Sequence, residues 1–444
     1  MEYSVLDLLV PPVFLFIIFF FAIRHRQRKE LREAYYKYYT SGLAVKLVGS
    51  VALCLVYTFY YKGGDTTLYF KGSLSLLKLA EKDFGQFLEV MFKPRTPETY
   101  SYFDKTTGWP GYWWDNHSFF VVKVVTLFSL LGFKSFIGTA MLLAWASFSG
   151  VWKLYQLFAR LYPQLSKELA ISILFIPGVF FWGSGILKDT ITISCVGWYA
   201  WAFYEVLIKK RFGPGKITAL IISSWLMLSV KPYILFALLP GSTIWLATNY
   251  ATRIQSKTLR NLFLPTMIGI GLGLGFLILA NLQSSLGDYN FDNILQKAVA
   301  SQQDQKQDYY GGNSFDIGEF DPTIPSMLGK AHAAIAAALF RPYLWDVRNP
   351  VMFLSSLENT YILLLTVFLL FRLRFFGFFK IIGKDSLLLF SFLFALFFAF
   401  SVGISISNFG TLVRLKIPGI PFFVASLFLI RYYYEKQSGK KLGI

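Results

Sequence analysis

Three acidic residues stand at or near the ends of long apolar segments, where a carboxylate is costly unless it has a task. Asp65 follows the apolar segment 44–61, and Asp189 lies in the turn GSGILKDT. Glu358 lies about two helical turns inside the segment 350–371. A carboxylate in such a place can act as a general base or hold a metal ion. These three are therefore the candidate catalytic residues, and Asp65 is also a candidate metal ligand.

Basic residues occupy the same kind of position as these acids. The cations at the ends of apolar segments are Lys188, Lys231, Arg341, Arg348 and Arg414. Lysine and arginine at helix ends commonly extend to lipid headgroups, so each cation alone has an ordinary explanation. Arginine in particular forms fork-like hydrogen bonds to phosphate oxygens. Together, the acids and cations predict a site that binds a lipid phosphate and transfers a group from it.

The first of these acids follows two glycines, in the stretch YYKGGDTTLYFKG. Glycine adopts φ values that other residues resist, so Gly63 and Gly64 allow a sharp turn where the chain leaves an apolar segment. We expect that turn to hold the Asp65 carboxylate at the mouth of the site.

The composition of the chain indicates the kind of protein that positions these residues. The chain has 444 residues, of which 55% are hydrophobic and only 15% are charged. A soluble domain carries about 25% charged residues, so an all-α polytopic membrane protein is predicted. The net charge is +18, but the basic residues lie in short clusters between apolar segments. Such clusters indicate topology and contacts with anionic membrane lipids, and not nucleic-acid binding.

Eleven apolar segments are long enough to cross a bilayer. They are 9–23, 44–61, 135–157, 168–185, 190–208, 216–231, 233–249, 261–283, 350–371, 385–403 and 415–430. Basic clusters follow every second segment, which places the N-terminus outside and the C-terminus in the cytoplasm. The apolar stretch 118–133 is short and carries Lys123. If it crossed, the later basic clusters would face outward, so it is predicted to be an interfacial or re-entrant helix.

This topology leaves two large extracytoplasmic loops, 62–134 and 284–349, and puts all the candidate acids and cations on one side. Aromatic and imidazole groups of the first loop, Trp113, Trp114 and His117, are candidate contacts to a sugar or an acceptor. We expect three regions. They are an added N-terminal helix with a basic segment (1–43), a catalytic membrane core (44–249) and the C-terminal helices (250–444).

The order of these motifs resembles the GT-C superfamily of membrane glycosyltransferases. It is most like the branch of protein O-mannosyltransferases and aminoarabinose transferases. The resemblance lies in GGDTTLY with Asp65, in DNHSFFVVKVVTLFSLLGF with His117, and in IPGVFFWGSGILKDT with Lys188 and Asp189. It covers about residues 44–240 in arrangement. The chain lacks the prolines that follow the family's histidine, and it has Thr66 and Thr67 where many members have a second acid.

The resemblance implies a hexosyl or pentosyl transferase that uses a polyprenyl-phosphate-linked donor. Its acceptor would be lipid-linked, a glycan or a protein, at the outer face of the bacterial cytoplasmic membrane, in cell-envelope glycan or glycolipid synthesis. No cofactor is required by the pattern, although Mg²⁺ or Mn²⁺ at Asp65 stays open. The missing prolines leave a surface-polysaccharide polymerase or ligase of the O-antigen type as an alternative. A transporter or flippase of a lipid-linked or anionic solute is the alternative from another class.

Overall fold

The computed structural model of the protein describes most of the chain. It covers residues 4–251, the single positions 256, 266 and 269, and the ranges 291–307 and 313–439. Apart from positions 266 and 269, the predicted apolar segment 261–283 lies outside the described residues, as do positions 284–290 and 308–312 of the second predicted loop.

The described residues form helices, without a single strand. One isolated antiparallel bridge joins Ser314 and Asn408. The all-α prediction is therefore confirmed for the part of the chain that the structure describes.

Six of the described helical segments are long and apolar enough to cross a membrane. They are Leu6–Glu30 (α1), Ala34–Tyr60, Lys188–Ile208, Pro232–Ala251 (α12), Pro350–Leu373 (α18) and Ser386–Ser405 (α20). Two bent helix pairs raise the number to as many as eight. The predicted span 168–185 is instead split into α8 (Ser166–Leu174) and α9 (Pro177–Trp182). These apolar helices support a membrane protein, and the figure of eleven spans stays a prediction.

The first bent pair includes the stretch expected to be interfacial or re-entrant. α6 (Asn116–Leu131) and α7 (Phe136–Leu161) meet at 109°. Phe133 and Lys134, in the break between them, both have positive φ, a conformation that cannot continue a helix. The second pair, α21 (Phe409–Leu415) and α22 (Ile420–Ser438), meets at 66°.

The chain forms two compact units that interleave in sequence. The first comprises Met1–Pro163, Phe180–Tyr199 and Ile222–Lys231, and the second comprises Gln164–Val179, Ala200–Ile221 and Pro232–Ile444. Each is described separately below.

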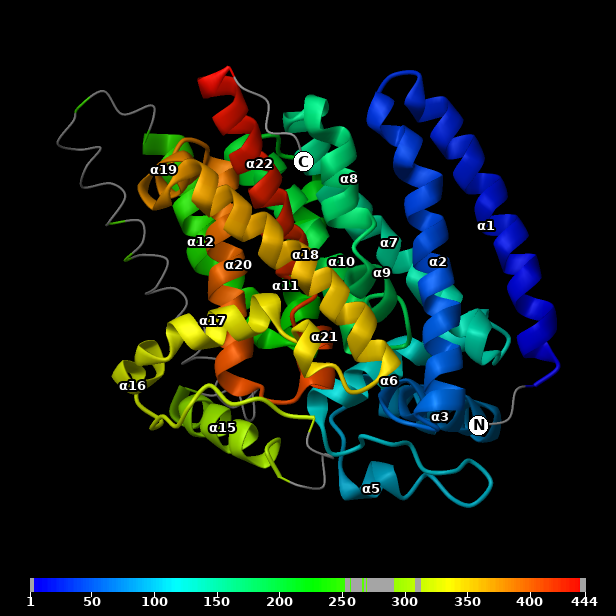
Figure 1. The fold of residues 1–444 in the computed structure, drawn as a ribbon. Coiled ribbons are helices and arrows are strands. Elements are labelled where there is room, and N and C mark those ends of the chain that lie inside the picture. Colours follow the sequence, from blue (N-terminus) through cyan, green and yellow to red (C-terminus); the bar gives the residue numbers. More distant parts are fainter. Residues whose placement is uncertain are drawn as a thin grey trace. The chain divides into compact units, whose positions relative to one another are not determined.

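In the first unit, α1 and α2 (Tyr39–Leu55) run side by side and both pack against α7 (Figure 1). The helix α3 (Asp65–Lys82) packs against α6 and α4 (Phe84–Phe92). The unit also contains η1 (Ala34–Tyr38), η2 (Val56–Tyr60) and α5 (Pro97–Tyr100), with parts of α9, of α10 (Lys188–Phe203) and of α11 (Pro214–Val230).

In the second unit, α20 is central and packs against α12, α17 (Ala331–Phe340) and α22 (Figure 1). The helix α8 lies on α22, and α18 contacts both α17 and α22. The remaining elements are η3 (Pro163–Leu165, whose first residue belongs to the other unit), η4 (Tyr204–Ile208), α15 (Phe291–Asp304), α16 (Ile324–Gly329), η7 (Leu344–Asp346) and α19 (Phe375–Ile382).

Candidate functional site

The two glycines before Asp65 form a sharp turn, as the sequence predicts. Gly63 has a φ of +151° and Gly64 a φ of +113°, so both adopt backbone conformations that favour glycine. Asp65 is the first residue of α3, where the helix dipole favours a negative charge. The Tyr112 hydroxyl donates a hydrogen bond of 2.5 Å to Asp65 Oδ1. The carboxylate is therefore half-buried and oriented by a tyrosine of the first predicted loop.

Asp189 and Lys231 form a buried ion pair in the same unit. Lys231 Nζ donates to Asp189 Oδ1 at 2.5 Å, and the two side chains are 8% and 0% exposed. The two residues come from the first turn of α10 and from the position after α11. A buried charge without its partner costs several kcal/mol, so each of these groups needs the other. Most of the Lys231 charge is thus compensated inside the protein.

Lys188 is the more accessible lysine of the cluster. Its ammonium lies 3.6 Å from Asp115 Oδ2, and its side chain is 20% exposed. It also interacts electrostatically with Asp65 and Lys231, which shows that the expected acids and lysines of this unit are neighbours. Asp115 is its hydrogen-bonding and ion-pair partner. An ammonium has three donors, so Lys188 can contact an incoming anion while it stays beside Asp115.

Asp115 links this cluster to the candidate residue His117. Its Oδ1 caps α6 by accepting from the backbone N–H groups of His117 and Ser118, at 2.9 and 3.1 Å. Burial alone would raise the pKa of Asp115, but the Ser118 hydroxyl and the Lys188 ammonium hold that pKa below its usual value. His117 Nδ1 lies 2.9 Å from the Ser229 carbonyl. Since a carbonyl only accepts, Nδ1 carries the proton and donates it.

The two candidate tryptophans lie in different surroundings. Trp113 is 3% exposed and packs edge-on against Phe103 and Phe119, which places it in the core of the first unit. Trp114 is 69% exposed, and its neighbour in the loop, Trp109, is 52% exposed. A sugar face could stack on Trp114 and Trp109, whereas Trp113 is buried and packs the loop against the core.

Among the described residues there is no group of three or more His, Cys, Asp or Glu side chains that could hold a metal ion.

Lys46 lies near the start of the predicted segment 44–61, where a lysine is expected to extend to the lipid headgroups. The structure places it differently. It is 3% exposed and donates to the Gly183 carbonyl, in the turn that precedes Lys188.

The remaining candidate residues belong to the second unit. The Arg341 guanidinium lies over the rings of Phe315 and Tyr343, with centroid distances of 5.3 and 5.4 Å. Arg348 is exposed, and Arg414 is half-buried on α21. The structure therefore brings Lys188 and Lys231 together with Asp65 and Asp189 in the first unit. The three candidate arginines belong to the second unit.

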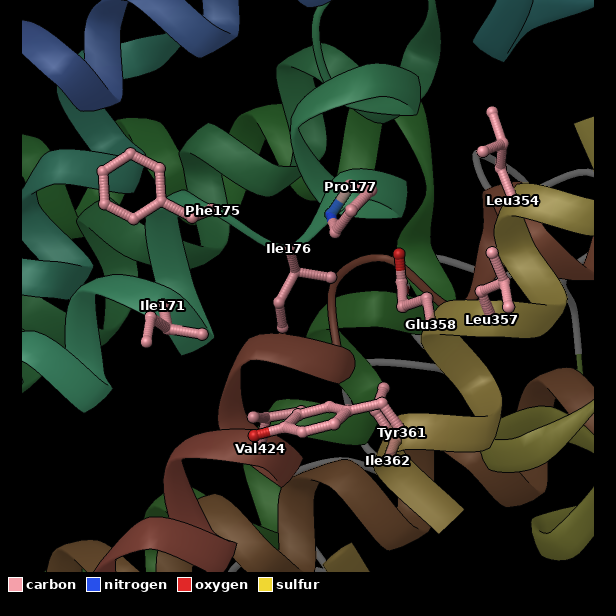
Figure 2. Close-up of a pocket in the computed structure, with 10 residues that line it drawn as sticks. All are labelled: Ile171, Phe175, Ile176, Pro177, Leu354, Leu357, Glu358, Tyr361, Ile362 and Val424. Carbon is pink, nitrogen blue, oxygen red and sulfur yellow. The ribbon is translucent and has the colours of Figure 1, made fainter. Parts of the chain in front are cut away.

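Glu358 lines an apolar cavity of about 350 Å³ in the second unit (Figure 2). Its Oε2 accepts a hydrogen bond of 2.5 Å from the Gly178 backbone N–H. A Cβ at Gly178 would lie 2.9 Å from Oε1 and 3.0 Å from Oε2, so a larger residue here would displace the Glu358 carboxyl group. The buried Lys416 interacts electrostatically with Glu358, and its ammonium donates to Asn359 Oδ1 at 2.5 Å.

Two residues of these sites, Asp115 and Lys416, were not among the sequence candidates. Tyr112 was expected from the sequence as an aromatic contact to a sugar, and its hydrogen bond to Asp65 was not expected. An Asp directly before an apolar helix is a common N-cap signal, which could have identified Asp115. No sequence signal selects Lys416 over Arg414, two residues earlier.

The chain matches no protein-family model, no curated protein and no solved structure.

Proposed function

We propose that the protein is a membrane glycosyltransferase that moves a sugar from a polyprenyl-phosphate-linked donor to an acceptor. In this proposal the chain has the eleven-span topology deduced from charge, and the site lies on the extracytoplasmic face of a bacterial cytoplasmic membrane. The product would belong to a cell-envelope glycan or glycolipid.

One observation supports the proposal most. A half-buried carboxylate, Asp65, and a partly exposed lysine, Lys188, are electrostatic neighbours at the N-terminal ends of α3 and α10. Helix N-termini and a cation stabilise an anion such as a phosphate. The neighbouring carboxylate supplies the base that a transfer to a hydroxyl group requires.

The chemistry follows from these positions. The Asp65 carboxylate takes the proton of the acceptor hydroxyl, and the acceptor oxygen attacks the anomeric carbon with inversion. The bond between that carbon and the phosphate oxygen breaks, and the lipid phosphate leaves with the electron pair. Lys188 stabilises the charge that develops on this phosphate. Tyr112 holds the base in place, and the Asp189–Lys231 pair fixes the start of α10.

Transfer from a labelled donor tests the proposal. Wild-type protein in proteoliposomes should move tritiated hexose or pentose from polyprenyl phosphate to a cell-envelope acceptor fraction. Asp65→Asn should lower the rate by at least about 100-fold, in the range typical of a lost general base. Lys82→Met is the matched control, because Lys82 belongs to α3 but pairs with Asp104 at 2.7 Å on the surface. Full activity of Asp65→Asn would exclude Asp65 as the base.

A transporter is the second candidate, because the described helices include a buried ion pair and two sharply bent pairs. Ionisable groups inside membrane segments and broken helices are common in transporters. The same proteoliposomes separate the two functions. Accumulation of a lipid-linked or anionic solute without any glycosyl product would favour transport and contradict the transferase.

A further inference from the structure

The cavity beside Glu358 is apolar almost throughout. It is lined by residues of α8, α18 and α22, by Phe175 and Ile176 between α8 and α9, and by Pro177 at the start of α9. Figure 2 shows these side chains around a common space, with the Glu358 carboxyl group directed towards Pro177. Its volume of about 350 Å³ has room for a chain of roughly ten methylene-sized groups.

The cavity opens along the apolar face of a candidate membrane helix. Leu354, Leu357 and Tyr361 of α18 are 65%, 46% and 47% exposed, although they line it. In a bilayer, such side chains contact acyl or isoprenoid chains and not water. The occupant that reaches this cavity is therefore a lipid chain.

The polar end of that lipid is constrained by the Glu358 carboxylate. Oε2 is occupied by the Gly178 N–H, while Oε1 accepts no hydrogen bond from any described residue. Burial in this apolar wall disfavours a charge on the carboxyl group, and the interaction with Lys416 and the Gly178 N–H offset that burial only in part. A phosphate or carboxylate headgroup would bring a negative charge into this apolar wall, where burying it is costly. An ammonium group would add a charge in an apolar wall where Lys416 already compensates Glu358.

We propose that this cavity binds a lipid alcohol, with its chain along α18 and its hydroxyl group donating to Glu358 Oε1. The inference goes beyond the proposed transfer reaction and does not depend on it. In this inference Glu358 binds a hydroxyl group, whereas the phosphate of the proposed reaction is bound at Lys188 in the first unit.

Photolabelling in nanodiscs tests the proposal. The probes are 1-dodecanol and farnesol, each with a diazirine in its chain, and labelled peptides are mapped by mass spectrometry. We expect labelling of the 350–373 or 166–182 peptides, and the stronger probe distinguishes a fatty alcohol from an isoprenoid alcohol. Excess unlabelled dodecanol should compete at least about tenfold better than dodecyl phosphate or dodecylamine, because either of those headgroups brings a charge into the apolar wall.

Variants at exposed positions keep the fold intact. Leu357→Trp fills the cavity and should reduce labelling at least about tenfold, by steric exclusion. Leu364→Trp is the matched control, because Leu364 is 62% exposed on the same helix but does not line the cavity. Glu358→Gln keeps a hydrogen-bond acceptor and should weaken labelling less than Glu358→Leu does.

Three results would overturn the proposal: no labelling of these peptides, equal loss of labelling in Leu357→Trp and Leu364→Trp, or equal competition by alcohol and phosphate. Normal labelling of a folded Glu358→Leu protein would remove the hydroxyl contact. If that variant does not fold, the tryptophan pair and the headgroup series still decide.

Discussion

Removing one partner of the buried Asp189–Lys231 pair should destabilise the first unit strongly. Lys231→Met leaves the Asp189 carboxylate, which is fully buried, without the ammonium that lies 2.5 Å from it. Such a loss costs roughly 3–5 kcal/mol. With about 2–4 °C per kcal/mol for a domain of this size, the melting temperature should fall by at least roughly 6 °C.

The chain has its own reporters for this measurement. Cys54 and Cys195 are both free and buried in the first unit, so a thiol-reactive fluorophore detects the unfolding of that unit. Lys188→Met is the matched control. The Lys188 side chain is one-fifth exposed and lies 3.6 Å from Asp115, a partly exposed pair worth about 0–1 kcal/mol.

A second substitution separates charge from packing. Asp189→Asn combined with Lys231→Met removes both charges, so it should recover at least half of the lost melting temperature. If Lys231→Met melts like the wild type, or if the double variant melts no higher than Lys231→Met, the pair does not stabilise the unit as argued.

Other predictions concern neighbouring contacts. Tyr112→Phe removes the hydroxyl that orients Asp65. It should lower the transfer rate about tenfold without changing the melting temperature, and an unchanged rate would assign Tyr112 to packing alone. Gly178→Ala places a Cβ 2.9 Å from Glu358 Oε1, so it should weaken dodecanol labelling. Gly377→Ala should not, because its Cβ would make only an ordinary contact of 3.9 Å with Leu373 Cβ. Hydrogen bonds from Lys82, Thr106 and Thr107 hold the pKa of Asp104 far below its usual value. The stabilisation of this loop should therefore persist above about pH 4 and be lost as the pH falls further, seen as faster amide exchange at residues 104–108.

The helical fold and its apolar segments could be predicted because they depend on local composition and on helix length. The same holds for the glycine turn before Asp65, since a positive φ is a local property of residue type. The break between α8 and α9 was harder to see. The apolar run continues through it, and only Pro177 marks the end of one helix and the start of the next.

The partners within the sites could not be predicted, because they depend on tertiary contacts. Asp189 and Lys231 were each selected as candidates, but 42 positions separate them and nothing local indicates that they pair. Selecting Arg414 and not Lys416 shows the same limit. Arg414 lies in the last turn of α21 and Lys416 directly follows that helix, and only the packed structure shows which one lies near Glu358.

Release of polyprenyl phosphate from a lipid-linked sugar tests the central claim most directly. The assay measures single-turnover release by the wild type, by Lys188→Met and by the surface control Lys82→Met. The account predicts at least about 100-fold slower release for Lys188→Met and wild-type release for Lys82→Met, because Lys188, and not Lys82, is proposed to stabilise the leaving phosphate. Equal release by all three proteins, with both variants folded, would contradict the claim that this cluster carries the transfer.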